Sequence, residues 1–259
     1  MPKSRNPKIE FDQLQMFFGE PYVIDLEDCE GSITVYQPTI GDIIRLGETK
    51  FYTSLNLLIS NTTSYRTMLW DIGVDWNEMS DFELFVILYQ GIDPDVNHLL
   101  FHEIDLTKFE LFKKQTEGAE KAVLFDREHN IEIDENVYQH ICQYLRNVFN
   151  IFPEEKITTD NTLKQWYITK DKRQQEIDKK KDKPKNSILS VISGCLNHPG
   201  FKYKSSELAE LNVCQFYDSV RRLQIYEQTS AIMHGVYAGL CLGGADKLKP
   251  DDYNFMRDS

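Results

Sequence analysis

Apolar and polar residues alternate over 22–26 and again over 33–37, with turn-forming residues at Asp28–Gly31 between the two runs. Successive side chains of a strand point to opposite faces of a sheet, so this alternation predicts a β-hairpin that ends at Pro38. A two-stranded hairpin is marginally stable by itself in water. We therefore expect it to pack against the helices that follow.

From Thr39 onward, apolar residues recur at the three- and four-residue steps of amphipathic helices. Thr39 is the expected N-cap of a helix over 40–60, which Gly47 divides into two. Ser80, with Glu83 three residues later, forms a capping box for another helix. Further helical repeats cover 64–73, 94–101, 137–149, 188–196 and 212–240, and a brief turn is expected over 206–211.

A second hairpin is expected where the helical repeat gives way to two short alternating runs, Val123–Phe125 and Ile131–Ile133. The first dozen residues read as a polar tail. The pattern predicts a mainly α fold with one or two small β-hairpins (α+β), in which an N-terminal hairpin-plus-helices part precedes a C-terminal helical part.

Between these two parts lies a charged run, Lys164–Lys185, that offers little apolar surface after Ile168. Such a run cannot bury enough apolar surface to offset its ordering entropy in a core, so it predicts an exposed helix that frays into a linker. Pro184 ends any helix there. We expect an N-terminal domain over 1–157, a charged helix or linker over 158–186 and a C-terminal helical domain over 187–259.

The chain has 259 residues and a formal net charge of −12, so its surface as a whole repels nucleic acid and anionic membranes. No apolar run approaches the roughly 20 residues that a membrane span needs, and the polar N-terminus does not resemble a signal peptide. The five cysteines are widely spaced and odd in number, which favours free thiols in a cytoplasmic protein. We expect no nucleic-acid partner and no membrane partner, although the lysines of 164–185 leave contact with phosphates as an alternative to a solvated helix.

The sequence contains few candidates for catalytic or cofactor-binding motifs. His98 and His102 share a helix face, but the zinc-protease pattern requires Glu directly after the first histidine, and Leu99 stands there. Glycine-rich nucleotide-binding loops and nucleophile elbows are missing from the sequence. The sequence therefore predicts a protein that is not an enzyme, with no metal or cofactor.

The longest helical repeat, Asn212 to Leu240, carries aromatic rings on or beside its apolar stripe. Amphipathic rings suit a partner helix as well as a core. Because the C-terminal part is too small to cover this stripe by itself, we expect the stripe to bind a partner or a second copy. The expected partner-binding residues are Phe216, Tyr217, Val220, Leu223 and Tyr226.

The segments 33–58, 80–88 and 212–239 resemble the tail assembly chaperones of long-tailed bacteriophages. The resemblance lies in a general order of features: a hairpin, Pro-Thr-Ile, a helix, Gly-Glu and Phe-Tyr, then a later Phe-Tyr and Arg-Arg-Leu. It implies an acidic, helical, non-enzymatic protein of the host cytoplasm. Such a protein binds the tape measure protein, the tail tube subunits, or both, during tail morphogenesis.

Many members of that family are made in a short form and in a frameshifted form with a C-terminal extension, and the division of this chain at 164–185 is similar in layout. The resemblance carries over no catalytic residues. A structural virion component, such as a tail or baseplate subunit, is the alternative function.

Overall fold

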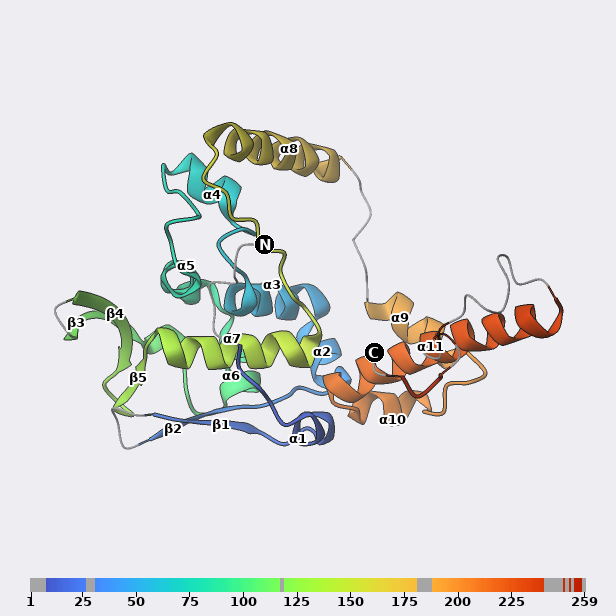
Figure 1. Ribbon diagram of the computed structural model, residues 1–259. Coiled ribbons are helices and arrows are strands. Elements are labelled where there is room, and N and C mark those ends of the chain that lie inside the picture. Colours follow the sequence, from blue (N-terminus) through green and yellow to red (C-terminus); the bar gives the residue numbers. More distant parts are fainter. Residues whose placement is uncertain are drawn as a thin grey trace.

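A computed structural model describes residues 8–26, 31–116, 119–180, 188–239, 249, 252 and 254–257. The fold is mainly helical with two small antiparallel sheets, which confirms the predicted fold class (Figure 1). The helices are α1 (Gln13–Phe18), α2 (Ile40–Leu46), α3 (Glu48–Ile59), α4 (Arg66–Asp71), α5 (Asp81–Leu88), α6 (Pro94–Phe101), α7 (Glu135–Phe149), α8 (Asn161–Lys179), α9 (Ile188–Leu196), α10 (Ser205–Glu210) and α11 (Val213–Tyr237). Short 3₁₀ helices are η1 (Tyr89–Gly91) and η2 (Leu106–Lys108).

The predicted N-terminal hairpin is confirmed. Strand β1 (Tyr22–Asp25) pairs with β2 (Ser32–Val35), with Tyr22 opposite Val35. The predicted turn lies outside the described residues except for Gly31. Ile33 and Val35 are fully buried, and the backbone N–H of Tyr36 donates to Leu100 O at 2.8 Å. The hairpin is thereby fixed to α6.

Both predicted helix starts are confirmed, and the break at Gly47 separates α2 from α3. Thr39 caps α2 through a capping box, in which Asp42 N donates to Thr39 Oγ1 at 3.1 Å and Thr39 N donates to Asp42 Oδ2 at 2.8 Å. Ser80 and Glu83 form the same reciprocal pair at the start of α5. These caps satisfy backbone N–H groups that a helix leaves without a partner.

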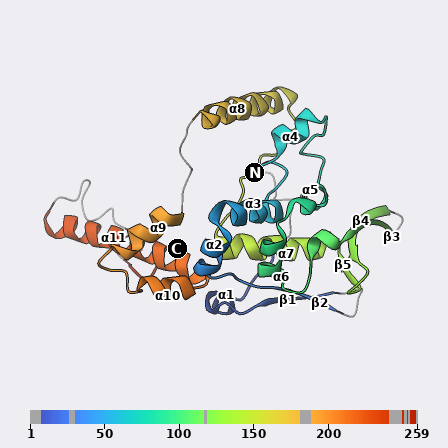
Figure 2. The ribbon, with the colours of Figure 1, turned by 180° about the vertical axis from the view of Figure 1, so that it is seen from behind.

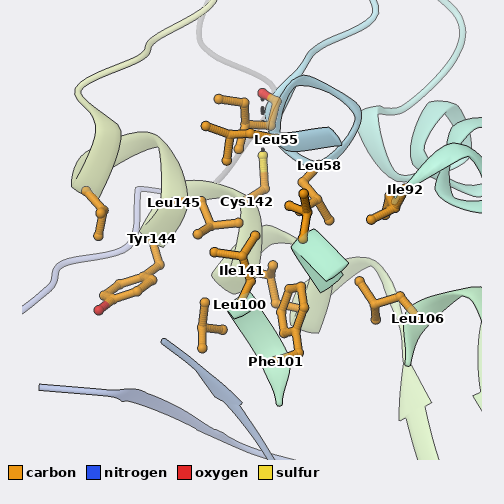
Figure 3. Close-up of a cluster of buried hydrophobic side chains, with 14 of the residues drawn as sticks. Leu55, Leu58, Ile92, Leu100, Phe101, Leu106, Ile141, Cys142, Tyr144 and Leu145 are labelled. Atoms are coloured by element: carbon orange, nitrogen blue, oxygen red, sulfur yellow. Dashed lines mark hydrogen bonds between the residues drawn. The ribbon is translucent and has the colours of Figure 1, made fainter. Parts of the chain in front are cut away.

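Helix α7 lies at the centre of the core and contacts α3, α5, α11, β1 and β5. Figure 3 shows Ile141, Cys142 and Leu145 of α7 directed toward side chains of α3 and α6. The buried Tyr138 hydroxyl donates to Leu58 O at 3.2 Å, so its polar group is satisfied inside the core.

The second sheet has the strand order β3-β4-β5, with β3 (Glu110–Thr116), β4 (Ala119–Asp126) and β5 (Ile131–Ile133). The predicted hairpin corresponds to β4 and β5, which pair with Leu124 opposite Ile133. Strand β3 was not predicted. It carries a run of polar residues, and Leu111 points to solvent.

The C-terminal part completes the same core instead of forming one of its own. Backbone bonds join Ile40 N to Leu211 O (3.0 Å) and Val213 N to Pro38 O (3.2 Å). Ile188, Leu208, Val213 and Phe216 belong to the buried cluster that also contains the hairpin and α7. The proposed boundaries at 157 and 186 therefore do not coincide with a break in the core.

A short helix, α1, directly follows the expected polar tail and was not predicted from the sequence. The Asp12 carboxylate caps it by accepting from Leu14 N and Gln15 N at 2.9 and 3.1 Å. Gly19 ends it at φ +77°, where a Cβ atom would approach the Asn212 side chain within 2.8 Å. Glycine fits both the left-handed backbone and the close contact.

Candidate functional site

The predicted partner-binding stripe is only partly available to a partner. Phe216 is fully buried in the intramolecular core, which corrects its assignment as an exposed anchor. Tyr217 and Val220 are half-buried against the same core. The hydroxyl groups of Tyr217 and Tyr52 lie 2.8 Å apart and share a hydrogen bond. These residues are covered because α7 and α1 of the N-terminal part pack against α11.

The two remaining predicted residues lie further along α11. Leu223 is half-buried beside Gly200. Tyr226 is 57% exposed. Beyond it, α11 extends away from the α3–α7 core, as Figures 1 and 2 both show. The structure thus divides the predicted stripe into a core half and an exposed half.

Large apolar side chains are exposed on α9 and on the second half of α11. We call this set the C-terminal apolar residues, and it consists of Leu189, Val191, Leu196, Tyr226 and Tyr237. Phe255 and Met256, close to the chain end, are also exposed.

The segment around Phe255 is attached to α11 by polar bonds, since Arg222 Nη1 donates to Arg257 O at 2.8 Å and Arg257 Nη2 donates to Gln228 Oε1 at 3.2 Å. Helix α11 is also linked to the loop after α9, where His198 Nε2 lies 3.3 Å from Glu227 Oε1. These bonds connect α11 to the chain end and to the loop after α9, so the three segments with exposed apolar side chains are linked through α11.

His98 and His102 both contact groups that are not metal ligands. His98 Nδ1 lies 2.9 Å from His102 O, and the His102 ring stacks on Tyr36 with a centroid distance of 3.6 Å. Within the described part of the chain, no three His, Cys, Asp or Glu side chains gather so as to hold a metal ion.

The described cysteines are unsuited to nucleophilic chemistry. Burial raises the pKa of the Cys142 thiol to about 11 and also raises the pKa of Cys195 and Cys214. A thiol with a raised pKa stays protonated at neutral pH, whereas the thiolate is the nucleophile.

Two cavities lie among the described residues. The larger, about 430 Å³, is lined by Arg146, Asp81 and Asn61 among others. Arg146 there donates to Ile59 O (2.7 Å) and Ser60 O (3.2 Å), so it satisfies the carbonyls at the end of α3. This arrangement is structural.

The smaller cavity, about 200 Å³, contains a bond of 2.6 Å between Tyr22 Oη and His140 Nδ1. Burial lowers the pKa of His140, which favours the neutral ring that this bond needs. The bond joins β1 to α7 and is likewise structural.

The charged run 164–185 is described as far as residue 180; the expected fraying into a linker lies outside the described residues. The run is helical as far as Lys179, and α8 lies against α4 (Figure 1). Two of its lysines are paired: Lys164 Nζ lies 2.5 Å from Asp75 and Lys172 Nζ lies 2.5 Å from Asp71. These contacts were missed because α8 offers its partner mostly polar groups, which a search for apolar periodicity does not detect.

Comparisons with family models, curated proteins and solved structures found no match to this chain. No described helix has both the length and the apolar character required to cross a membrane.

Proposed function

We propose that the protein is a non-catalytic tail assembly chaperone of a long-tailed phage, which binds the tape measure protein, the tail tube subunits, or both, in the host cytoplasm. The observation that carries the proposal is the exposure of the C-terminal apolar residues on α9 and on the second half of α11. Exposed apolar groups at one place on a surface are typical of protein–protein contact sites. The order of features in 33–58, 80–88 and 212–239 directs the proposal to this family.

The charge of the chain supports the same role. A net charge of −12 on 259 residues keeps a protein soluble while it presents apolar side chains. The partner contact then relies on apolar burial at the C-terminal part, and the acidic remainder of the surface limits unspecific association.

The test is co-expression of the full chain with a tape measure protein and a tail tube protein of a long-tailed phage, followed by purification on a tag carried by the partner. A variant with Leu189→Asp and Tyr226→Asp places charges on both helices of the contact. We expect co-purification to fall at least tenfold, because truncating or charging an anchor of an interface typically costs about 2 kcal/mol or more. Leu111→Asp on β3 is the matched control, because Leu111 is about as exposed as Tyr226 but lies in the second sheet.

Two outcomes contradict the proposal. Equal co-purification of the double variant and the control would exclude the C-terminal apolar residues as the contact. Mass spectrometry of purified phage particles separates the chaperone from a tail or baseplate subunit, because a chaperone is absent or scarce in the finished particle. A stoichiometric amount there would establish the structural virion component instead.

A further inference from the structure

The chain binds part of itself as a peptide. We call residues 154–179 the strap; it begins as an extended segment and continues as α8. Side chains of the segment 61–77 hold the backbone of the extended part at every second residue. The four bonds are Asn61 Nδ2 to Glu154 O (3.1 Å), Lys156 N to Thr63 Oγ1 (3.1 Å), Trp76 Nε1 to Lys156 O (3.0 Å) and Thr158 N to Asn77 Oδ1 (3.2 Å).

This bonding pattern differs from a β-sheet. The segment 61–77 contributes side-chain groups and the strap contributes main-chain groups, so the bonds depend little on which side chains the strap carries. Main-chain recognition of an extended segment is how many proteins bind peptides. The surface under the strap therefore has the properties of a peptide-docking site.

The helical part of the strap adds sequence specificity. Lys164, Ile168, Asp171 and Gln175 lie at i, i+4, i+7 and i+11, and so share one face of α8. Their partners belong to α4 and the residues after it. Asp171 accepts two bonds from Arg66, from Nε at 2.5 Å and from Nη2 at 2.7 Å.

Two further polar contacts join α8 to the same surface. Lys164 Nζ lies 2.5 Å from Asp75, and Gln175 Nε2 donates to Thr67 Oγ1 at 3.1 Å. Burial acts to raise the pKa of Asp75, but the bonds from Lys164 and Asn77 outweigh it and lower the pKa. Asp75 is therefore held ionised beside Lys164.

The apolar contact between the strap and the rest of the chain is small. Among the described residues of α8, only Lys164 and Ile168 are buried. Ile168 and the half-buried Tyr167 pack in a cluster with Leu69, Leu84 and Trp76 that is separate from the main core. Burial of one isoleucine and partial burial of one tyrosine do not offset the conformational entropy of ordering a helix of this length.

The ion pairs stabilise the docked strap less than their number suggests. Buried ion pairs often contribute little net free energy, because desolvation offsets their attraction. The Arg66 side chain is 9% exposed, and its Nη1 atom has no hydrogen-bond partner within the described part of the chain. Such an unsatisfied buried donor opposes docking.

We propose that the surface formed by α4 and residues 61–77 is a peptide-docking site that the strap occupies reversibly, and that the strap of a second copy of this chain binds there when the site is vacated. The occupant has an extended segment followed by a helix with lysine, an apolar residue and aspartate at i, i+4 and i+7. The strap's own contacts are the basis for this choice of occupant. The inference is independent of the proposed phage function.

The test uses the full chain and a labelled synthetic peptide of residues 152–180. Lys164→Met with Asp171→Asn weakens the chain's own strap and leaves Arg66 and Asp75 of the docking site intact. We expect this variant to bind the peptide at least tenfold more tightly than the unaltered chain, whose site is filled. Lys170→Met with Glu176→Gln is the matched control, because it makes the same kinds of change at exposed positions of α8. A peptide carrying the Lys164 and Asp171 substitutions is expected to bind at least tenfold more weakly.

Hydrogen exchange separates release of the strap from general unfolding. In the unaltered chain, amide protection of α8 is expected to fall as sodium chloride rises from about 0.1 to 1 M, while protection of α7 stays, because salt screens partly exposed charges. The proposal is overturned if the variant releases its strap but binds no peptide, or if its strap stays protected. Joint loss of protection in α7 and α8 would also overturn it, since the strap would then be an inseparable part of the fold.

Discussion

At the scale of single residues, Asp126 and His129 form an ion pair in the turn between β4 and β5, with Nδ1 and Oδ2 2.6 Å apart. The hydrogen bond that His129 Nδ1 donates to the Asp126 carboxylate raises the pKa of His129. Burial acts to raise the pKa of Asp126, but bonds from His129 and Glu128 N lower it overall. Stabilisation by His129 is complete below its unfolded pKa of about 6.5 and is lost as pH rises through its raised folded value. Stabilisation by Asp126 is present above its unfolded pKa of about 3.9 and is lost as pH falls through its lowered folded value.

The pair therefore stabilises the turn most between about pH 4 and pH 6.5. We expect Asp126→Asn to lower the melting temperature more at pH 5.5 than at pH 8.5. In the same variant, the NMR titration midpoint of the His129 ring is expected to move down toward its ordinary value. An unchanged midpoint would show that Asp126 does not govern the protonation of His129.

Phe216 and Tyr226 illustrate what a sequence reveals about a single residue. Both are aromatic residues of one helix, yet Phe216 is fully buried and Tyr226 is 57% exposed. Periodicity identifies an apolar face, but it does not identify which segment covers that face. Here the cover comes from residues nearly 200 positions earlier in the chain, through Asn212 Nδ2 donating to Phe17 O at 3.1 Å.

At the scale of elements, the contact between α2 and α10 depends on a glycine. A Cβ atom at Gly41 would lie 2.8 Å from the carbonyl oxygen of Ala209. Backbone atoms on both sides leave little room for a side chain to move. The close approach brings α10 onto α2 and places Leu208 in the core.

Gly41→Ala is expected to destabilise the protein by about 1–3 kcal/mol through overpacking, although alanine is favoured over glycine in a helix by about 1 kcal/mol. Gly235→Ala in α11 is the control, since nothing lies within 4 Å of its added Cβ atom. That control is expected to be neutral or stabilising by about 0.4–1 kcal/mol. Urea unfolding measures the free energy of unfolding of both variants. A stabilised Gly41→Ala variant would show that α10 moves to accept the added methyl group with no loss of stability.

Elements with strong local signals were predicted well from the sequence. The capped helices α2 and α5 and the alternating strands β1 and β2 are examples. Helix α1 was missed because it is short and buries only Met16. Strand β3 was missed because its charged residues obscure the alternation of apolar and polar positions. Contacts made by polar groups, such as those of α8, leave no apolar period in the sequence.

At the scale of the whole molecule, one core joins the N-terminal and C-terminal parts. A fragment of residues 1–180 lacks Leu208, Val213 and Phe216, each of which is buried in that core. Removing a large buried side chain costs about 2–5 kcal/mol, and total stabilities are about 5–15 kcal/mol. We therefore expect the fragment to melt at a much lower temperature than the full chain and to bind a dye that detects exposed apolar surface.

Calorimetry and dye fluorescence on the fragment and the full chain measure this effect. A fragment that matches the full chain in melting temperature and binds no dye would restore an independent N-terminal domain. The sequence alone favoured such a division, because a charged run between two apolar regions is typical of a linker. It gave no indication that the chain returns to its first helix after that run.

The bridge between Thr39 and Asn212 sets a condition on the order of folding. Contacts between residues far apart in sequence form slowly, because a long loop must close before they stabilise anything. The ribosome releases the segment 8–40 long before it completes residue 212. Until then the buried surfaces of α1 and α2 have no cover, and the nascent chain is open to aggregation. The chain therefore reaches its native state only late in its own synthesis, when α10 and α11 emerge and close the core.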